Sequence, residues 1–300
     1  MNRRQRNATI FALLAAVLYA LNSPLSKLLL GQVSPTTMAA LLYLGAGLGL
    51  AITGGVRRLA GIKSTRRPLN RSDTPYIIGM VVLDIAAPVL LMTGLTLTTA
   101  ANAALLNNFE IVATSLIALC LFGEKISWRL WLAIGLVTVS SVILSFEDMS
   151  SLSFSAGSLL VLLACVCWGF ENNCTRKLSD ADPLTIVVIK GFCSGGGALA
   201  VAFARGETLP RLLPLCGALA LGFVAYGLSI YFYIHAQRDL GAAKTSAYYA
   251  AAPFVGAALS LIIFRQLPDA AYLAALVIMI AGSCLATADT AIQSEQEISA

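Results

Sequence analysis

The segment Ala101–Glu124, ANAALLNNFEIVATSLIALCLFGE, is long and apolar enough to cross a lipid bilayer as one helix. Its middle nevertheless carries Asn107, Asn108 and Glu110. A carboxylate at the centre of a spanning helix costs about 2.5 kcal/mol or more, and it is tolerated where it faces protein, a partner or a watery cavity. Asn107 and Glu110 are three residues apart and therefore share one helix face. We predict that this face lines a substrate pathway, while interhelical hydrogen bonding alone remains the alternative.

The composition is that of an integral membrane protein. Of the 300 residues, 58% are hydrophobic and 12% are charged, whereas soluble domains carry about 25% charged residues. The net charge of +5 would suit a nucleic-acid partner. The basic residues, however, lie in short loops between apolar runs, where membrane topology explains them. We therefore expect contact with a lipid bilayer and no contact with nucleic acid.

Motifs for catalysis or metal binding are absent from the sequence. The seven cysteines lie in apolar runs without a CxxC pair, and His235 is the only histidine. We expect no metal site, no disulfide framework and no cofactor, because free cysteine also packs as a small apolar residue. The chain has no HExxH or GxSxG motif, which argues against an intramembrane enzyme, and no Walker motif for ATP-driven transport.

The apolar runs predict an all-α protein with ten transmembrane helices. They cover roughly residues 9–30, 36–56, 75–95, 99–122, 128–146, 156–177, 183–204, 211–234, 241–264 and 269–288. The first run is too long for the apolar core of a signal peptide, so we expect it to be retained as a helix. With the N-terminus in the cytoplasm, 15 of the 20 Lys and Arg residues lie inside and four outside. The positive-inside rule therefore predicts that both termini are cytoplasmic.

The chain contains an internal repeat. The motif Tyr19-Ala-Leu-Asn22 in the first span matches Trp168-Gly-Phe-Glu171 in the sixth, at an offset of 149 residues. The fourth span, from Ala101, parallels the ninth, from Ala243, at an offset of 142. Five spans per half is an odd number, so the two halves must be inverted relative to each other, as in many secondary transporters. The predicted units are residues 1–148, residues 155–288 and a cytoplasmic tail, 289–300.

These features resemble the drug/metabolite transporter superfamily, and its EamA-type members in particular. The similarity rests on the ten spans, on Tyr19-Ala20 and Trp168-Gly169 early in each half, and on Leu121-Phe-Gly-Glu124 at the end of the fourth span. The second half departs from the family pattern, because Phe264-Arg265-Gln266 stands where a Gly-Glu pair is usual. The chain is most similar to YddG-type exporters of aromatic and other amino acids. That resemblance implies an exporter in the bacterial inner membrane with a central cavity between the halves.

Polar and aromatic residues at membrane depth are the candidates for this cavity. They are Tyr19, Asn22, Asp84, Asn107, Asn108, Glu110, Trp168, Glu171, Tyr248 and Tyr249. Asp84 precedes Pro88 by four residues, and the proline suggests a locally opened helix at this point. The alternative is that the Asp84 carboxyl group is protonated or pairs with the backbone groups that the proline frees. Asn22 and Glu171 are repeat partners, so both halves place a polar group at the same depth.

The aromatic candidates and Lys190 each have a simpler interpretation. Trp168 would stack on a substrate or bind its ammonium through a cation–π contact, whereas packing in the core or against lipid explains it, and Tyr19, equally well. One of Tyr248 and Tyr249 is expected to face the cavity. Lys190, in the seventh span, either binds a substrate carboxylate, pairs with a nearby acid or extends to the membrane surface.

Together these residues predict a secondary transporter that exports amino acids from the cytoplasm by alternating access. An exporter of drugs or other small metabolites is the alternative, and a membrane anchor explains the matched polar positions less well. A nucleotide-sugar carrier is disfavoured because no basic cluster lies at membrane depth. The sequence leaves open whether protons are exchanged. It also leaves open whether the protein is a monomer or a weak dimer, which the Gly45–Gly49 spacing would allow.

Overall fold

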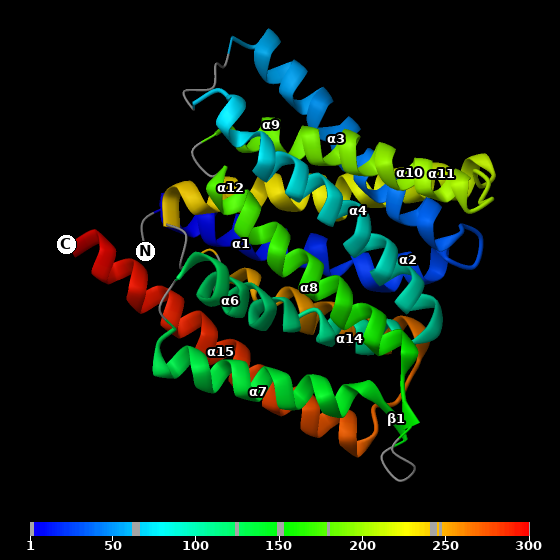
Figure 1. Ribbon diagram of the computed structural model, residues 1–300, viewed down its shortest axis with the longest axis vertical. Helices are drawn as coiled ribbons and strands as arrows, with labels where there is room; N and C mark the ends of the chain where they lie inside the picture. Colours follow the sequence, from blue (N-terminus) through cyan, green and yellow to red (C-terminus); the bar gives the residue numbers. More distant parts are fainter. Residues whose placement is uncertain are drawn as a thin grey trace.

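The computed structural model describes residues 3–61, 67–123, 126–148, 153–178, 181–240, 245 and 248–299 (Figure 1). These residues form a helical bundle with one short hairpin. The helices before the hairpin are α1 (Arg3–Ala20), α2 (Asn22–Leu29), α3 (Pro35–Leu59), the 3-10 turn η1 (Arg71–Asp73), α4 (Thr74–Leu97), α5 (Ala100–Leu106), α6 (Phe109–Phe122) and α7 (Trp128–Ser145).

The hairpin consists of β1 (Phe146–Asp148) and β2 (Ser153–Phe154), and it joins the two halves. The helices after it are α8 (Ala156–Lys177), α9 (Pro183–Ile189), the π-helical segment η2 (Lys190–Ser194), α10 (Gly195–Ala204), α11 (Leu212–Leu221), the π-helical segment η3 (Gly222–Leu228), α12 (Ser229–Leu240), α14 (Ala252–Phe264) and α15 (Ala270–Ser299).

The helices agree with the spans expected from hydropathy. Nine stretches of the described chain are helices long and apolar enough to cross a membrane, and the apolar helix α14 is shorter. α14 occupies the place of the ninth predicted span, of which residues 241–244, 246 and 247 lie outside the described residues. The lipid-facing character is visible on α3, where Ile52 is 68% exposed and Leu59 92% exposed. Large apolar side chains on the outside as well as the inside are what a bundle in lipid requires.

Several spans are interrupted rather than continuous. The prediction of one continuous fourth helix is wrong, because α5 ends and α6 begins around a turn at Asn107 and Asn108. The Asn108 side-chain amide donates to the Leu105 carbonyl at 3.0 Å and so competes with the helical backbone pattern. The first span has a similar one-residue interruption at Leu21, between α1 and α2. The expectation of an opened helix at Pro88 is also wrong, because α4 continues through it.

Several helix pairings recur when the two halves are exchanged. α4 packs on α8, and α1 packs on α12, which are equivalent pairs under the sequence repeat. α5 packs on α14, α7 on α15, and α3 on α9 and α10, so each of these helices meets its own repeat partner. Figure 1 shows α7 and α15 side by side along one edge of the bundle and α3 beside α9 and α10 along the opposite edge.

Glycines allow the closest of these helix contacts. A side chain at Gly47 would lie 3.0 Å from the backbone of Gly191, where α3 meets η2. A side chain at Gly45 would collide with the Leu219 backbone, and one at Gly49 with the Phe223 ring. These glycines therefore serve the close packing of α3 on its neighbours inside the bundle. The Gly45–Gly49 pair is used inside the chain, so it does not offer a surface for a dimer.

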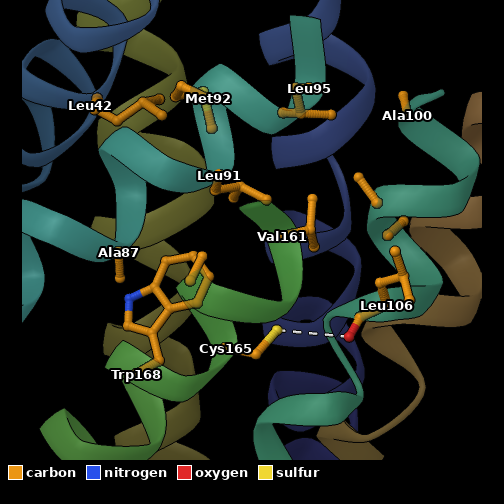
Figure 2. Packing of buried hydrophobic residues seen from close by; sticks show 14 of the residues in the cluster. Leu42, Ala87, Leu91, Met92, Leu95, Ala100, Leu106, Val161, Cys165 and Trp168 are labelled. Atoms are coloured by element: carbon orange, nitrogen blue, oxygen red, sulfur yellow. Dashed lines mark hydrogen bonds between the residues drawn. The ribbon is translucent and has the colours of Figure 1, made fainter. Parts of the chain in front are cut away.

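The core between α4 and α8 is filled by apolar side chains (Figure 2). Leu91 of α4 meets Val161 of α8, and the Cys165 thiol donates to the Leu106 carbonyl at 3.5 Å. Trp168 lies one turn further along α8, with 6% of its surface exposed. The core packing that explains Trp168 without a transport role is therefore present.

The two chain ends lie on the same side of the bundle, as the N and C labels of Figure 1 show. Most of the predicted tail, 289–300, is helical, because α15 continues as a helix to Ser299. Its apolar span ends near Ala288, and the helix extends past it. A polar segment can also form a helix, so hydropathy marks the end of the apolar span and not the end of the helix.

Candidate functional site

A cavity of about 270 Å³ lies in the middle of the bundle, between the two halves. Its lining is rich in polar and aromatic side chains, although most of the surrounding bundle is apolar. The lining residues are Tyr19, Tyr43, Asp84, Asn107, Asn108, Glu110, Ile111, Trp168, Glu171, Asn172, Lys190, Tyr226, Ile230, Tyr249, Ala250, Ala252 and Pro253. Eight of the ten predicted site residues belong to this set.

The charged centre of the cavity is built around Lys190. Its ammonium lies 2.6 Å from Glu171 Oε1 and 3.4 Å from Asp84 Oδ2. Asp84 also accepts a hydrogen bond of 2.9 Å from the Tyr43 hydroxyl, and Glu171 accepts one from Thr175. Both carboxylates are buried, with 1% and 3% of their side-chain surface exposed. The alternative that Lys190 pairs with a nearby acid is therefore confirmed, and its partners are Glu171 and Asp84.

The backbone of the seventh span places Lys190 at this centre. Lys190 is the first residue of the π-helical segment η2, which follows α9. A π-helical turn rotates the following side chains relative to a regular helix, and such turns are frequent at functional sites. A buried ion pair requires good geometry, because removing both charges from water costs several kcal/mol per ion. The three-residue cluster of Asp84, Glu171 and Lys190 satisfies this condition across three helices.

Glu110 lies in the same cavity without a positive partner. Asn172 donates a hydrogen bond of 2.6 Å to Glu110 Oε1, and it also reaches Thr114 at 3.3 Å. No ammonium or guanidinium group of the described residues forms an ion pair with this carboxyl group. A carboxyl group at this depth that lacks a fixed cation is suited to bind a cationic group from outside the protein.

The helix break next to Glu110 supplies a further polar group. Asn107 lines the cavity, and its Oδ1 is buried without a hydrogen-bond partner among the described residues. An unsatisfied buried acceptor costs about 1–3 kcal/mol, so it is an unusual feature unless a ligand or water uses it. Asn108 has a structural role instead, because its Oδ1 accepts a hydrogen bond of 3.1 Å from the Ser283 hydroxyl of α15.

Aromatic rings form one wall of the cavity. The Tyr19 ring lies 5.9 Å from that of Tyr226 and 5.7 Å from that of Tyr249, measured between centroids. Tyr43 and Tyr226 are 5.4 Å apart. The Tyr249 hydroxyl is 3.2 Å from the Ser229 hydroxyl. Such a wall combines a flat apolar surface with hydroxyl groups at its edges.

Two predicted residues lie outside this cavity. Asn22 borders a small neighbouring void of about 10 Å³, and its amide donates to the Tyr226 hydroxyl at 3.2 Å. Asn22 therefore lies next to the site and contacts its lining through Tyr226. Tyr248 is 37% exposed and does not line the cavity, whereas its neighbour Tyr249 does.

Four important lining residues were not among the predicted site residues. They are Tyr43, Asn172, Lys190 and Tyr226. The 142-residue offset maps Asp84 onto Tyr226, so the repeat would have found this tyrosine if it had been applied to the third and eighth spans. No sequence pattern marks Tyr43 as a site residue, because a tyrosine among small apolar residues in a span is equally expected to pack in the core.

Comparison with known proteins identifies this architecture. A model of the EamA-like transporter family matches residues 6–146 and 155–288. The chain belongs to the EamA-like transporter family. Since members of this family are transporters, the EamA-like chain described here is a multi-pass membrane transporter with its cavity between two family repeats.

Individual relatives of this EamA-like protein agree with the family assignment. An uncharacterized transporter of Methanothermobacter thermautotrophicus is 27% identical over 271 residues, covering 84% of this chain and 78% of the relative. The uncharacterized transporter YyaM of Bacillus subtilis is 23% identical over 241 residues, covering 77% of each chain. One crystal structure matches with a TM-score of 0.64 at 21% identity, covering 95% of this chain and 99% of the other. That structural likeness shows the fold.

Proposed function

We propose that this transporter exports amino acids, with aromatic ones among its substrates. The proposal rests on one observation: Glu110 has no fixed cation among the described residues, and it lies in the same cavity as an aromatic wall. An amino acid carries an ammonium, a carboxylate and a side chain, and each of these has a matching surface in the cavity. We further propose a bacterial inner-membrane location with both termini in the cytoplasm, in line with the Lys and Arg distribution.

The ammonium of the substrate is assigned to Glu110 and to the unpaired Oδ1 of Asn107. Both groups are acceptors, and together they would replace the water that an ammonium loses on entering the cavity. The substrate carboxylate is assigned to the tyrosine hydroxyls of the aromatic wall, because Asp84 and Glu171 already hold Lys190. The side chain then lies against Tyr19 and Tyr226.

The cavity is large enough for an amino acid. Its volume of about 270 Å³ is close to the lower end of the range of about 300–1,000 Å³ that is usual for ligand pockets. The single cation in the lining, Lys190, is held by two carboxylates, which counts against a phosphate-bearing substrate such as a nucleotide sugar. Export of another small metabolite remains the alternative function.

We propose alternating access as the transport mechanism, on the basis of the arrangement of the two halves. The proposed mechanism is that two inverted repeats rock around a fixed central site and expose it to each side in turn. The exchange-symmetric packing of α4 on α8 and of α1 on α12 supports this, because it offers two equivalent arrangements of similar energy. The driving force is either the substrate gradient or an exchanged proton.

A flux assay tests the proposal. The purified protein is reconstituted into vesicles loaded with single amino acids, and efflux is measured without ATP. Protein-dependent efflux of amino acids is expected, with Glu110→Gln strongly reduced. Efflux of dyes or sugars without any amino-acid flux would replace the proposal with the metabolite alternative. A pH jump in the same vesicles decides between a proton antiporter, whose rate changes with proton movement, and a facilitator, whose rate does not.

A further inference from the structure

A second large cavity lies at one end of the bundle, separate from the central site. It has a volume of about 780 Å³ and lies between the end of α3 and the start of α9, on the edge where the two halves meet. The lining residues are Ala51, Gly54, Gly55, Arg57, Arg58, Gly61, Asp182, Leu184, Thr185, Val188 and Ile189. None of these lines the central cavity, so the transport proposal does not use them.

The charges of this groove favour an anion. Arg57 is partly buried and Arg58 is exposed, and neither forms an ion pair with a carboxylate of the described residues. Asp182 also lines the groove, and its carboxylate accepts a hydrogen bond of 3.2 Å from Thr185. The two guanidinium groups outweigh this single carboxylate. Guanidinium groups bind phosphate through paired hydrogen bonds, and they lose less on desolvation than an ammonium does.

The surface next to the groove is the lipid-facing face of α3. Leu48, Ile52 and Val56 are 45%, 68% and 60% exposed, and they follow one another at every fourth residue of the helix. This apolar stripe leads directly to Arg57 and Arg58 at the helix end, where lipid headgroups lie. The groove therefore presents cations at headgroup depth and an apolar path below them.

Room for a ligand is kept by a glycine. A side chain added at Gly55 would meet no other atom within 4 Å, although Gly55 lines the groove. The neighbouring Gly54 is different, because a side chain there would meet Leu184 of α9 at 2.8 Å. Gly54 thus serves the packing of α3 on α9, and the open space lies in front of Gly55.

We propose that this groove is a binding site for an anionic phospholipid of the adjoining leaflet. Its phosphate binds Arg57 and Arg58, and one acyl chain lies along Ile52 and Val56. Basic pockets between transmembrane helices are a known solution for acidic headgroups.

The test measures how phosphatidylglycerol changes the melting temperature of the full-length protein in a zwitterionic detergent. Wild type is expected to show a saturable rise in Tm with phosphatidylglycerol and no rise with phosphatidylcholine. Each arginine near a membrane surface contributes about fivefold to the affinity for acidic lipid. The double variant R57Q/R58Q should therefore need roughly 25-fold more lipid for the same rise. The matched control is R129Q, which removes a cation near the start of α7.

A second variant leaves both arginines in place and fills the space instead. Gly55→Leu should weaken the phosphatidylglycerol effect, whereas Gly135→Leu should not, although Gly135 of α7 faces equally open space. Equal lipid responses of wild type, R57Q/R58Q and Gly55→Leu would overturn the proposal. A Tm rise produced equally well by inorganic phosphate would also overturn it, because the site would then bind a free anion instead of a lipid.

Discussion

The first and second halves of this EamA-like transporter pack alike but line the cavity differently. Each of α3, α5 and α7 meets its own repeat partner, and the contacts of α4 with α8 and of α1 with α12 form an exchanged pair. The cavity does not follow this symmetry. The first half contributes Asp84 where the second contributes Tyr226, and Asn107 where the second contributes Tyr249. The second half alone contributes a cation, Lys190.

The backbones of the halves differ in the same region. The seventh and eighth spans contain the π-helical segments η2 and η3, whereas their counterparts α3 and α4 are regular helices. Helix packing depends on small residues and shape, so it retains the symmetry of a repeat. A substrate such as an amino acid has no such symmetry, and a site that distinguishes its ends must be asymmetric. Residues that are equivalent in the two halves therefore stabilise the fold, and residues that differ between the halves are the ones expected to select the substrate.

The largest expected effect comes from removing the cation of the second half. Lys190→Met leaves Asp84 and Glu171 buried without their partner, and breaking a buried ion pair costs about 3–5 kcal/mol. We expect a loss of unfolding free energy of this size, measured by denaturation in detergent micelles. The triple variant Asp84→Asn/Glu171→Gln/Lys190→Met should recover most of it, because no unpaired charge remains. A single variant as stable as wild type would contradict the ion-paired cluster.

A smaller effect is expected from the acid of the first half, Glu110. The repeat partner of Glu110 is Ala252, so the second half has no substitute for this carboxyl group. A hydrogen bond to a charged group is worth about 1.5–3 kcal/mol, so Glu110→Gln should weaken substrate affinity at least about tenfold in the vesicle assay. The fold should be unaffected, because Asn172 can still bond to the amide. Glu207→Gln, outside the cavity, is the matched control, and equal affinities of the two variants would contradict the assignment.

Glu207 gives a pH-dependent test of a contact between the halves. It lies in the loop of the second half and accepts bonds of 2.8 Å and 2.9 Å from the Thr37 backbone and hydroxyl, and one of 3.4 Å from the Thr36 backbone. Burial raises the pKa of this carboxyl group, but the hydrogen bonds from Thr36 and Thr37 outweigh it and hold the pKa below its ordinary value. The Arg205 side chain is 4.0 Å away and exposed.

A lowered pKa in the folded state means that the contact stabilises above the unfolded pKa of about 4.3 and that this stability is lost as the pH falls through the folded pKa. We expect the wild type to lose about 1 kcal/mol more than Glu207→Gln below pH 4, a value typical of a helix N-terminal cap. Melting curves of both proteins from pH 7 to pH 3 measure it. Parallel curves throughout this range would show that the loop does not cap α3.

The sequence predicts the symmetric part of the molecule better than the asymmetric part. Hydropathy marks the spans, and the repeat brings Tyr19, Trp168 and Glu171 to the cavity, because these depend on local composition and on equivalent depth. It misses Lys190 as a site residue, since a lysine in a span has several plausible environments and only the tertiary structure selects among them. It also misses the break at Asn107–Asn108, because hydropathy does not detect side chains that compete with helical hydrogen bonds.

The smallest expected effect tests whether the two halves keep equivalent helix ends. α6 is followed by Gly123 with φ of 66°, and α14 is followed at the equivalent position by Arg265 with φ of 49°. Both residues are therefore in the left-handed region, where glycine is unstrained and other L-residues are disfavoured. Arg265→Gly should stabilise the protein by about 0.5–1 kcal/mol, since relief of this strain exceeds the entropy cost of a glycine.

The reciprocal variant sharpens this last test. Gly123→Arg should cost about 1–2 kcal/mol, because the first half then has the strained residue that the second half tolerates. The double variant should lie near wild type if the two ends are equivalent and independent. Both changes are read from unfolding in micelles. If Arg265→Gly instead destabilises the protein, the arginine side chain makes a contact that offsets its backbone strain, and the second half has changed the function of this helix end as it has changed the cavity.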